Sequence, residues 1–222
     1  MWGILWKISL CCAVLSSGLL VRGLESGYYR IQAELLQLQN PLGVRHDGAL
    51  CDNFGTCDPV IKVFLDTSRP MAAFPGARYI SQYQKIFTAT DQNEPLINKM
   101  VTEDVCGHPF TQANLRAYVK DDDSFLRLTD DHISDFDCLF SPSLDVPMGT
   151  DESTAIWSNG QPCVGTTQPG KIKLFFRYRM YRISPEECGK LSVTTNAPVV
   201  QPEIHTPVSA TQISATVRHA MA

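Results

Sequence analysis

Residues 52–65 read Asp52-Asn53-Phe54-Gly55-Thr56-Cys57-Asp58-Pro59-Val60-Ile61-Lys62-Val63-Phe64-Leu65. The first half is a glycine-containing loop with an aspartate near each end. The second half is a run of β-branched and aromatic residues, which is typical of a strand, and proline is tolerated at the first position of a strand. This stretch therefore predicts an acidic loop that runs directly into a β-strand.

A second acidic loop follows further along the chain. It reads Val119-Lys120-Asp121-Asp122-Asp123-Ser124-Phe125 and closes with Asp131-His132-Ile133-Ser134-Asp135-Phe136. Ca²⁺ takes roughly six to eight oxygen ligands, so carboxylates on two separate loops are the groups that a calcium site needs. We expect ligands from Asp52, Asp58, Asp121, Asp123 and Asp131. The alternative is that these aspartates are ordinary solvated turn residues.

Short strand patterns separated by turn residues recur along the chain. We predict strands at 28–38, 59–65, 113–119, 133–140 and 171–183, a less regular element at 78–88, and a long surface loop over 141–170. A helix is the alternative for 28–38, because Gln and Leu have no β preference. The pattern predicts an all-β fold, an antiparallel β-sandwich of about eight strands with long loops.

The two ends of the chain differ in composition from the rest. Residues 1–23 have the features of a signal peptide, because Lys7 precedes an apolar stretch that is shorter than a membrane-spanning helix requires. An uncleaved anchor is the alternative. We expect the folded domain to occupy residues 27–188, with no later transmembrane span. Residues 189–222 carry many Ser and Thr and few charges, and are expected to form a disordered or O-glycosylated tail.

Charge and motif content exclude several functions. The net charge is −4, and it becomes −6 when Lys7 and Arg22 leave with residues 1–23. An acidic balance speaks against nucleic-acid binding, which requires a basic patch. The Gly-x-Ser-x-Gly motif of hydrolases is absent, and the five histidines are scattered without ligand spacing. We therefore expect a binding module and not an enzyme.

The cysteines that remain after removal of residues 1–23 are even in number, which predicts disulfides in an oxidising, extracellular compartment. They are Cys51, Cys57, Cys106, Cys138, Cys163 and Cys188. Zinc is the weaker alternative, since no two of them have the spacing of a Cys-x₂₋₄-Cys ligand pair. We favour the pairings Cys51–Cys57, Cys106–Cys138 and Cys163–Cys188, although many connectivities are open.

The acidic loops resemble those of C2 domains. Residues 52–63 are similar to the first calcium loop of that family, where Gly-x-Ser-Asp-Pro-Tyr-Val-Lys-Val is common, and residues 119–123 with 131–136 are similar to the third. Residues 27–30, 38–43 and 175–179 resemble the N-terminal C2-like domain of Delta/Serrate-type Notch ligands. The sequence departs from these relatives in Cys57, in Val60, and in lacking the cysteine-rich and EGF-like repeats of Notch ligands.

The resemblance implies a secreted C2-like β-sandwich that binds Ca²⁺ and engages anionic phospholipid or a cell-surface partner through its calcium loops. Phe54 and Phe125 stand beside the expected ligands, where they could insert into a bilayer once the aspartates are neutralised. The alternative is that both rings fold back onto the sandwich. The alternative function is that of a non-enzymatic ligand or co-ligand of a Notch-type receptor pathway, acting through protein contacts.

Overall fold

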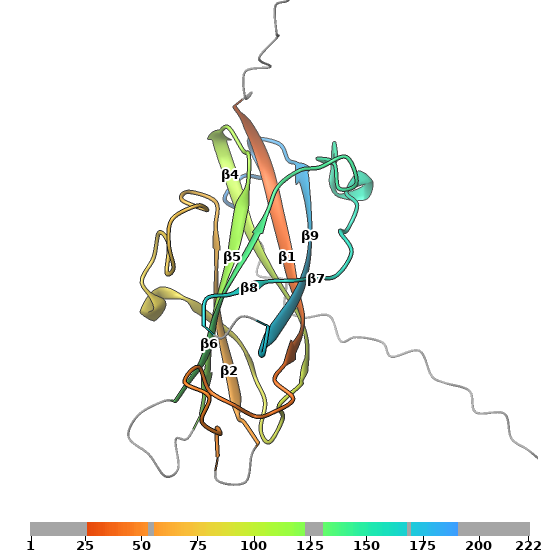
Figure 1. The fold of residues 1–222 in the computed structure, drawn as a ribbon. Coiled ribbons are helices and arrows are strands. Elements are labelled where there is room, and N and C mark those ends of the chain that lie inside the picture. Colours follow the sequence, from red (N-terminus) through yellow and green to blue (C-terminus); the bar gives the residue numbers. More distant parts are fainter. Residues whose placement is uncertain (1–25, 53–55, 123–130, 168–169, 191–222) are drawn as a thin grey trace, which may run out of the picture. The chain divides into compact units, whose positions relative to one another are not determined.

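Two antiparallel β-sheets form the fold of this protein, whose computed structural model describes residues 26–52, 56–122, 131–167 and 170–190. The four-stranded sheet has the order β4-β1-β9-β7 and the five-stranded sheet the order β3-β2-β5-β6-β8, and the two lie face to face (Figure 1). The strands are β1 (Gly27–Gln39), β2 (Pro59–Asp66), β3 (Gln84–Thr88), β4 (Leu96–His108), β5 (Ala113–Asp121), β6 (Asp131–Phe140), β7 (Gln161–Pro162), β8 (Val164–Gly165) and β9 (Lys173–Arg182). The short 3₁₀ helices are η1 (Ile80–Gln82) and η2 (Glu152–Thr154).

The core lies between the two sheets and is built by alternating side chains. In β9, Leu174, Phe176 and Met180 are buried, while Lys173 points outward, as the alternation in the sequence predicts. Ile31 and Leu35 of β1 belong to the same hydrophobic core. The second sheet contributes Ile61, Leu115, Ala117 and Phe136. The predicted all-β antiparallel sandwich is confirmed.

The structure confirms one predicted strand and corrects several other elements. Residues 28–38 form a strand and not a helix, since they lie within β1. No strand was predicted for the residues that form β4. The element expected over 78–88 divides into η1 and β3, and the loop expected over 141–170 contains η2, β7 and β8. β4 was not recognised because this edge strand buries few of its side chains and carries mixed charges, among them Lys99, Glu103 and Asp104. The alternation of apolar and polar residues is therefore weak.

All six cysteines of the described residues form disulfides, and one of the three predicted pairings is correct. Cys51 is bonded to Cys57, as expected. The other two predicted pairings are wrong, because the bonds are Cys106–Cys188 and Cys138–Cys163. β8 pairs with β6 through Asp137 and Val164, which places Cys163 beside Cys138 with Cα atoms 4.4 Å apart. Cys106 lies near the end of the unpredicted strand β4, within reach of the chain that follows β9.

A buried charge network holds the loop between β2 and β3 against the outer face of β5. The Arg116 guanidinium donates to Asp66 and to Asp137, and its Nη2 also donates to the carbonyls of Arg69, Pro70 and Ala72. Arg116 and Asp66 are fully buried. The contacts of this one β5 side chain, Arg116, therefore hold the loop in its conformation.

The predicted signal peptide and all but the first two residues of the predicted tail lie outside the described residues. Within the described ranges, no helix has the length and apolar character needed to cross a bilayer.

Candidate metal centre

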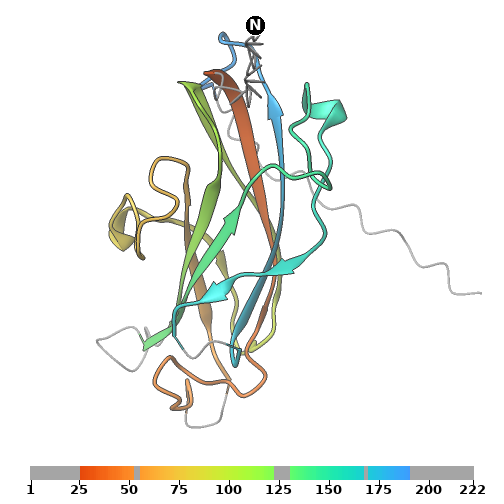
Figure 2. The same ribbon diagram turned by 45° about the horizontal axis from the view of Figure 1, so that its top comes forward.

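The connections β1–β2 (residues 40–58) and β3–β4 (89–95) meet the end of β5 and the start of β6 at one end of the sandwich, the lower end in Figures 1 and 2. Strand register brings them together, because Pro59 pairs with Asp121, and Asp121 pairs with Asp131. The β3–β4 loop joins them through Ala89 N, which donates to Pro59 O at 3.1 Å. Both acidic segments of the sequence therefore belong to one loop end.

The β1–β2 loop has a rigid frame of its own. The buried Asn40 side chain donates to Val44 O at 2.8 Å and accepts from Val44 N at 3.1 Å. Gly43 has a φ of 57°, in the left-handed region where glycine costs least. The buried Cys51–Cys57 disulfide then closes the segment that contains Asp52. This frame fixes both ends of the loop that bears Asp52 and leads to Asp58.

Asp121 is a fully buried residue that ties the first loop to β5. Its Oδ1 accepts a hydrogen bond of 2.5 Å from Asp58 N. The backbone returns the contact, since Asp122 N donates to Asp58 O at 3.0 Å. Asp121 and Asp58 are therefore adjacent, and Asp121 has a structural role that the sequence did not indicate.

Asp58 connects the first loop to the β3–β4 loop. Its Oδ1 accepts from Asp91 N at 2.6 Å, and Thr56 Oγ1 donates to Asp91 Oδ1 at 3.2 Å. Asp91 has a φ of 54°, a conformation that Asp and Asn tolerate better than most residues. Asn93 contributes a further contact, because its Oδ1 accepts from Cys57 N at 2.9 Å.

Sequence reasoning missed Asp91 and Asn93 as parts of this end. Their turn chemistry predicts a loop. Nothing showed that this loop lies beside the other two, because β4, the strand that follows it, was not recognised.

Asp131 stands at the first position of β6 and forms an ion pair with Arg45 of the first loop. The Arg45 side chain also contacts Asp47, at 3.2 Å between Nη2 and Oδ2. The hydrogen bond to Asp131 raises the pKa of Arg45 above its ordinary value, so the guanidinium stays charged. Arg45 was not predicted as part of this end, because the sequence around an isolated arginine in a loop does not indicate which carboxylate it will contact.

The other predicted site residues are Asp52, Asp123, Phe54 and Phe125. Asp52 is half-buried, next to the disulfide-bonded Cys51. Asp123, Phe54 and Phe125 lie outside the described residues.

The donor chemistry of this end fits a hard cation. Among the described residues, only Cys51, Cys57 and Asp121 form a group of three with potential ligand atoms within 4.8 Å of one another. The two cysteines are bonded to each other and offer no thiolate, which removes the ligands that zinc would prefer. What remains is oxygen, from Asp52, Asp58, Asp121 and Asp131, which is the donor type of Ca²⁺. The five-aspartate ligand set stays a prediction.

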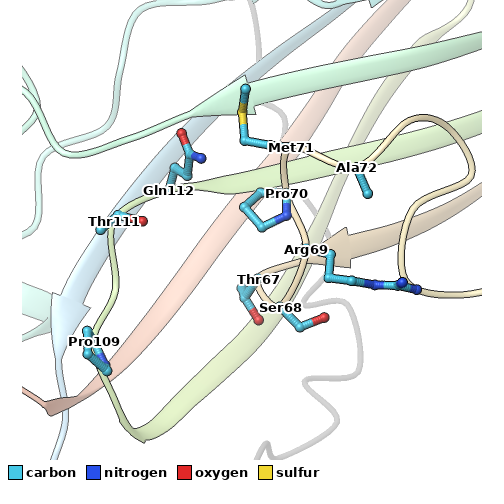
Figure 3. Close-up of a pocket in the computed structure, with 9 residues that line it drawn as sticks. All are labelled: Thr67, Ser68, Arg69, Pro70, Met71, Ala72, Pro109, Thr111 and Gln112. Atoms are coloured by element: carbon cyan, nitrogen blue, oxygen red, sulfur yellow. The ribbon is translucent and has the colours of Figure 1, made fainter.

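A hollow of about 580 Å³ lies at the opposite end of the sandwich, where β2 ends and β5 begins. Figure 3 shows its two walls, residues 67–72 on one side and Pro109, Thr111 and Gln112 on the other. The first wall is the segment whose carbonyls Arg116 holds. Arg69 is the only charged residue of the lining, so this hollow has neither the carboxylates nor the location of the acidic loop end.

Comparisons with known proteins identify the family. No protein-family model matches the chain, and no curated protein matches it either. The Drosophila C2-DSL-EGF1 structure is similar at 12% identity over 69% of this chain and 67% of that one, with a TM-score of 0.44. Human GIVD cytosolic phospholipase A2 is similar at 18% identity over 72% of this chain and 18% of that one, with a TM-score of 0.44. Neither likeness carries an argument.

The crystal structure of a C2 domain protein from Ramazzottius varieornatus is a stronger match. It shares 30% identity with this chain, and the alignment covers 74% of this chain and 94% of that one, with a TM-score of 0.67. That identity extends over nearly the whole of the other protein. The chain belongs to the C2 domain family.

Proposed function

We propose that this protein is a secreted calcium-binding C2 module that engages anionic phospholipid through its acidic loop end, and that it is not an enzyme. C2 domains commonly bind Ca²⁺ and phospholipid. The observation that carries the proposal for this chain is the register of three strands, which gathers Asp58, Asp121 and Asp131 at one end of the sandwich. The disulfides and the signal-like residues 1–23 support secretion.

In this proposal, Asp52, Asp58, Asp121, Asp123 and Asp131 supply the oxygens that hold calcium. The bound ion would cancel the repulsion between these carboxylates and offer its open coordination positions to lipid phosphate oxygens. Asp58 positions the neighbouring loop as well, because its Oδ1 accepts from Asp91 N. The Cys51–Cys57 disulfide and Asn40 hold the first loop in place, so fewer conformations are lost on binding.

Phe54 and Phe125 are the residues that we assign to contact with the apolar part of the bilayer. Burial of one phenylalanine side chain stabilises by about 1.5–3 kcal/mol. Two such rings would therefore add substantially to the electrostatic attraction between the loaded loops and anionic lipid. An Ala substitution at either position should weaken vesicle binding without changing calcium affinity.

The test is co-sedimentation of the purified protein with vesicles of phosphatidylserine and phosphatidylcholine, in calcium and in chelator. We expect binding that requires both calcium and the anionic lipid. Asp58→Asn should weaken it, because shape is kept and one charge is lost. Asp145→Asn, which removes the same charge from an exposed position beyond the far end of β6, serves as the matched control.

Absence of vesicle binding at millimolar calcium would overturn the phospholipid proposal. A saturable interaction with a cell-surface protein that survives chelation would favour the role of a receptor ligand instead.

A further inference from the structure

The residues around Arg45 form a fixed hairpin within the β1–β2 loop. Arg45 N donates to Ala49 O at 2.8 Å, and Gly48 N donates to Arg45 O at 3.0 Å. Gly48 has a φ of 88°, which closes the turn. The Asp47 side chain caps it, since its Oδ1 accepts from Ala49 N at 3.0 Å. Arg45 is thus displayed from a turn with a defined conformation.

This hairpin docks on the start of β6. His46 N donates to His132 O at 3.2 Å, and His46 Nδ1 lies 2.9 Å from the same oxygen. The His46 and His132 rings pack with centroids 4.8 Å apart, and Tyr118 stacks on His132 with centroids 5.0 Å apart. The docking carries the Arg45 guanidinium to the carboxylate of Asp131, which is 14% exposed.

Asp131 has a particular need for a cation. It pairs across β5 and β6 with Asp121, which is another carboxylate and is fully buried. Two like charges opposite each other on neighbouring strands are destabilising. The Arg45 guanidinium contacts Asp131 and so offsets part of that repulsion.

We propose that Arg45 is the built-in counter-ion of the acidic loop end, and that it sets the calcium affinity by competing with the metal for Asp131. This inference rests on the proposed calcium-binding function. The Asp131 carboxylate cannot bind the guanidinium and the metal fully at the same time. Metal binding therefore costs the free energy of the Arg45–Asp131 ion pair. The displaced guanidinium keeps a partner, because Asp47 is already in contact at 3.2 Å and its side chain is 46% exposed.

The experiment measures calcium affinity by isothermal titration calorimetry of the purified protein with calcium chloride alone. Arg45→Gln should tighten calcium binding about fivefold, the change that corresponds to an ion pair of about 1 kcal/mol. Arg45→Lys keeps the charge and should change the affinity less. Lys190→Gln removes one positive charge at the opposite end of the domain, beyond β9, and should leave the affinity unchanged.

A double-mutant cycle shows whether Asp131 mediates the effect. In an Asp131→Asn background, Arg45→Gln should alter calcium affinity less than about twofold. A second readout needs no metal. In chelator, Arg45→Gln should lower the melting temperature, because Asp121 and Asp131 lose their counter-ion, and Lys190→Gln should not.

The outcomes separate this inference from the function on which it rests. If calcium binds the wild-type protein and Arg45→Gln does not bind it more tightly, the competition is overturned and the calcium site stands. If neither protein binds calcium, the proposed function falls and the competition falls with it. Binding by Arg45→Gln alone would support the competition in its strongest form, with the guanidinium outcompeting the metal in the wild-type protein.

Discussion

The Arg116 guanidinium and the Asp66 carboxylate are both fully buried, and Arg116 Nε donates to Asp66 Oδ2 at 3.1 Å. Removing one partner of such a pair leaves an uncompensated charge in the interior, which costs about 3–5 kcal/mol. We therefore expect Arg116→Leu to lower the free energy of unfolding by that amount, as measured by urea denaturation. Arg182→Leu, at an exposed position of β9, should change it by about 0.5 kcal/mol or less. Equal effects of the two substitutions would contradict this account of the network.

Gly76 lies directly over the same pair. It has a φ of 81°, and a Cβ atom at this position would stand 2.2 Å from Arg116 Nε and 2.5 Å from Asp66 Oδ2. Gly76→Ala should therefore destabilise by more than the roughly 1–2 kcal/mol that a left-handed backbone costs an alanine. Gly170→Ala is the matched control, since Gly170 has a φ of 91° and nothing lies within 4 Å of its added Cβ. Similar melting temperatures for the two variants would show that the loop can move away from Arg116.

Low pH should destabilise the domain through Asp66. Burial alone would raise its pKa, but hydrogen bonds from the backbone of Arg69 and Ala77 and from Arg116 outweigh burial and lower it. A lowered pKa in the folded state means that the stabilisation is present above the ordinary aspartate pKa of about 3.9 and is lost as the pH falls through the folded value. Unfolding curves between pH 6 and acid conditions should show this loss, and Asp66→Asn should flatten it. A wild-type protein whose stability did not fall in acid would contradict the prediction.

The disulfides should contribute unequally to stability. The bond Cys106–Cys188 spans 82 residues and Cys51–Cys57 spans six. The chain-entropy relation gives about 4–5 kcal/mol for the long span and about 2 kcal/mol for the short one. Replacing Cys106 and Cys188 together by Ser should therefore lower the melting temperature more than replacing Cys51 and Cys57. Peptide mapping without reduction checks the pairing itself, and a Cys106–Cys138 fragment would contradict the structure.

Calcium should stabilise the folded protein. A ligand that binds only the native state adds RT ln(1 + [L]/Kd), which is about 2.7 kcal/mol at one hundred times Kd. We expect a higher melting temperature in millimolar calcium than in chelator, and a smaller difference for Asp58→Asn and Asp123→Asn. Asp145→Asn should retain the full difference. A wild-type melting curve that does not respond to calcium would reduce these aspartates to solvated turn residues.

The sequence predicts what depends on local pattern. The alternation of Leu174, Phe176 and Met180 identifies β9, and Pro59 with its β-branched followers identifies β2, because burial of one sheet face imposes a period of two. The positions of Asp58, Asp121 and Asp131, just before β2, at the end of β5 and at the start of β6, follow from these strands. These local signals are sufficient to predict the sandwich and its acidic loop end.

Long-range relations escape prediction. β4 is charged along its exposed edge, so its alternation is weak, and missing it led to two wrong disulfides. The contact between Arg45 and Asp131 joins residues 86 positions apart, and that between Arg116 and Asp66 joins residues 50 apart. An ion pair at such a separation produces no periodic pattern in the sequence. The sequence therefore does not indicate which two charged side chains will be partners in the folded protein.

The Cys106–Cys188 bond has a mechanical consequence. The chain enters β1 and leaves β9 at the same end, where Gly27 pairs with His108 and Ile183 N donates to Tyr28 O. Tension between the two chain ends would, without the bond, peel β9 from β1 one hydrogen bond at a time. With the bond, the pull on Cys188 passes covalently to β4, so β9 is shielded and the load falls on the ladder between β1 and β4.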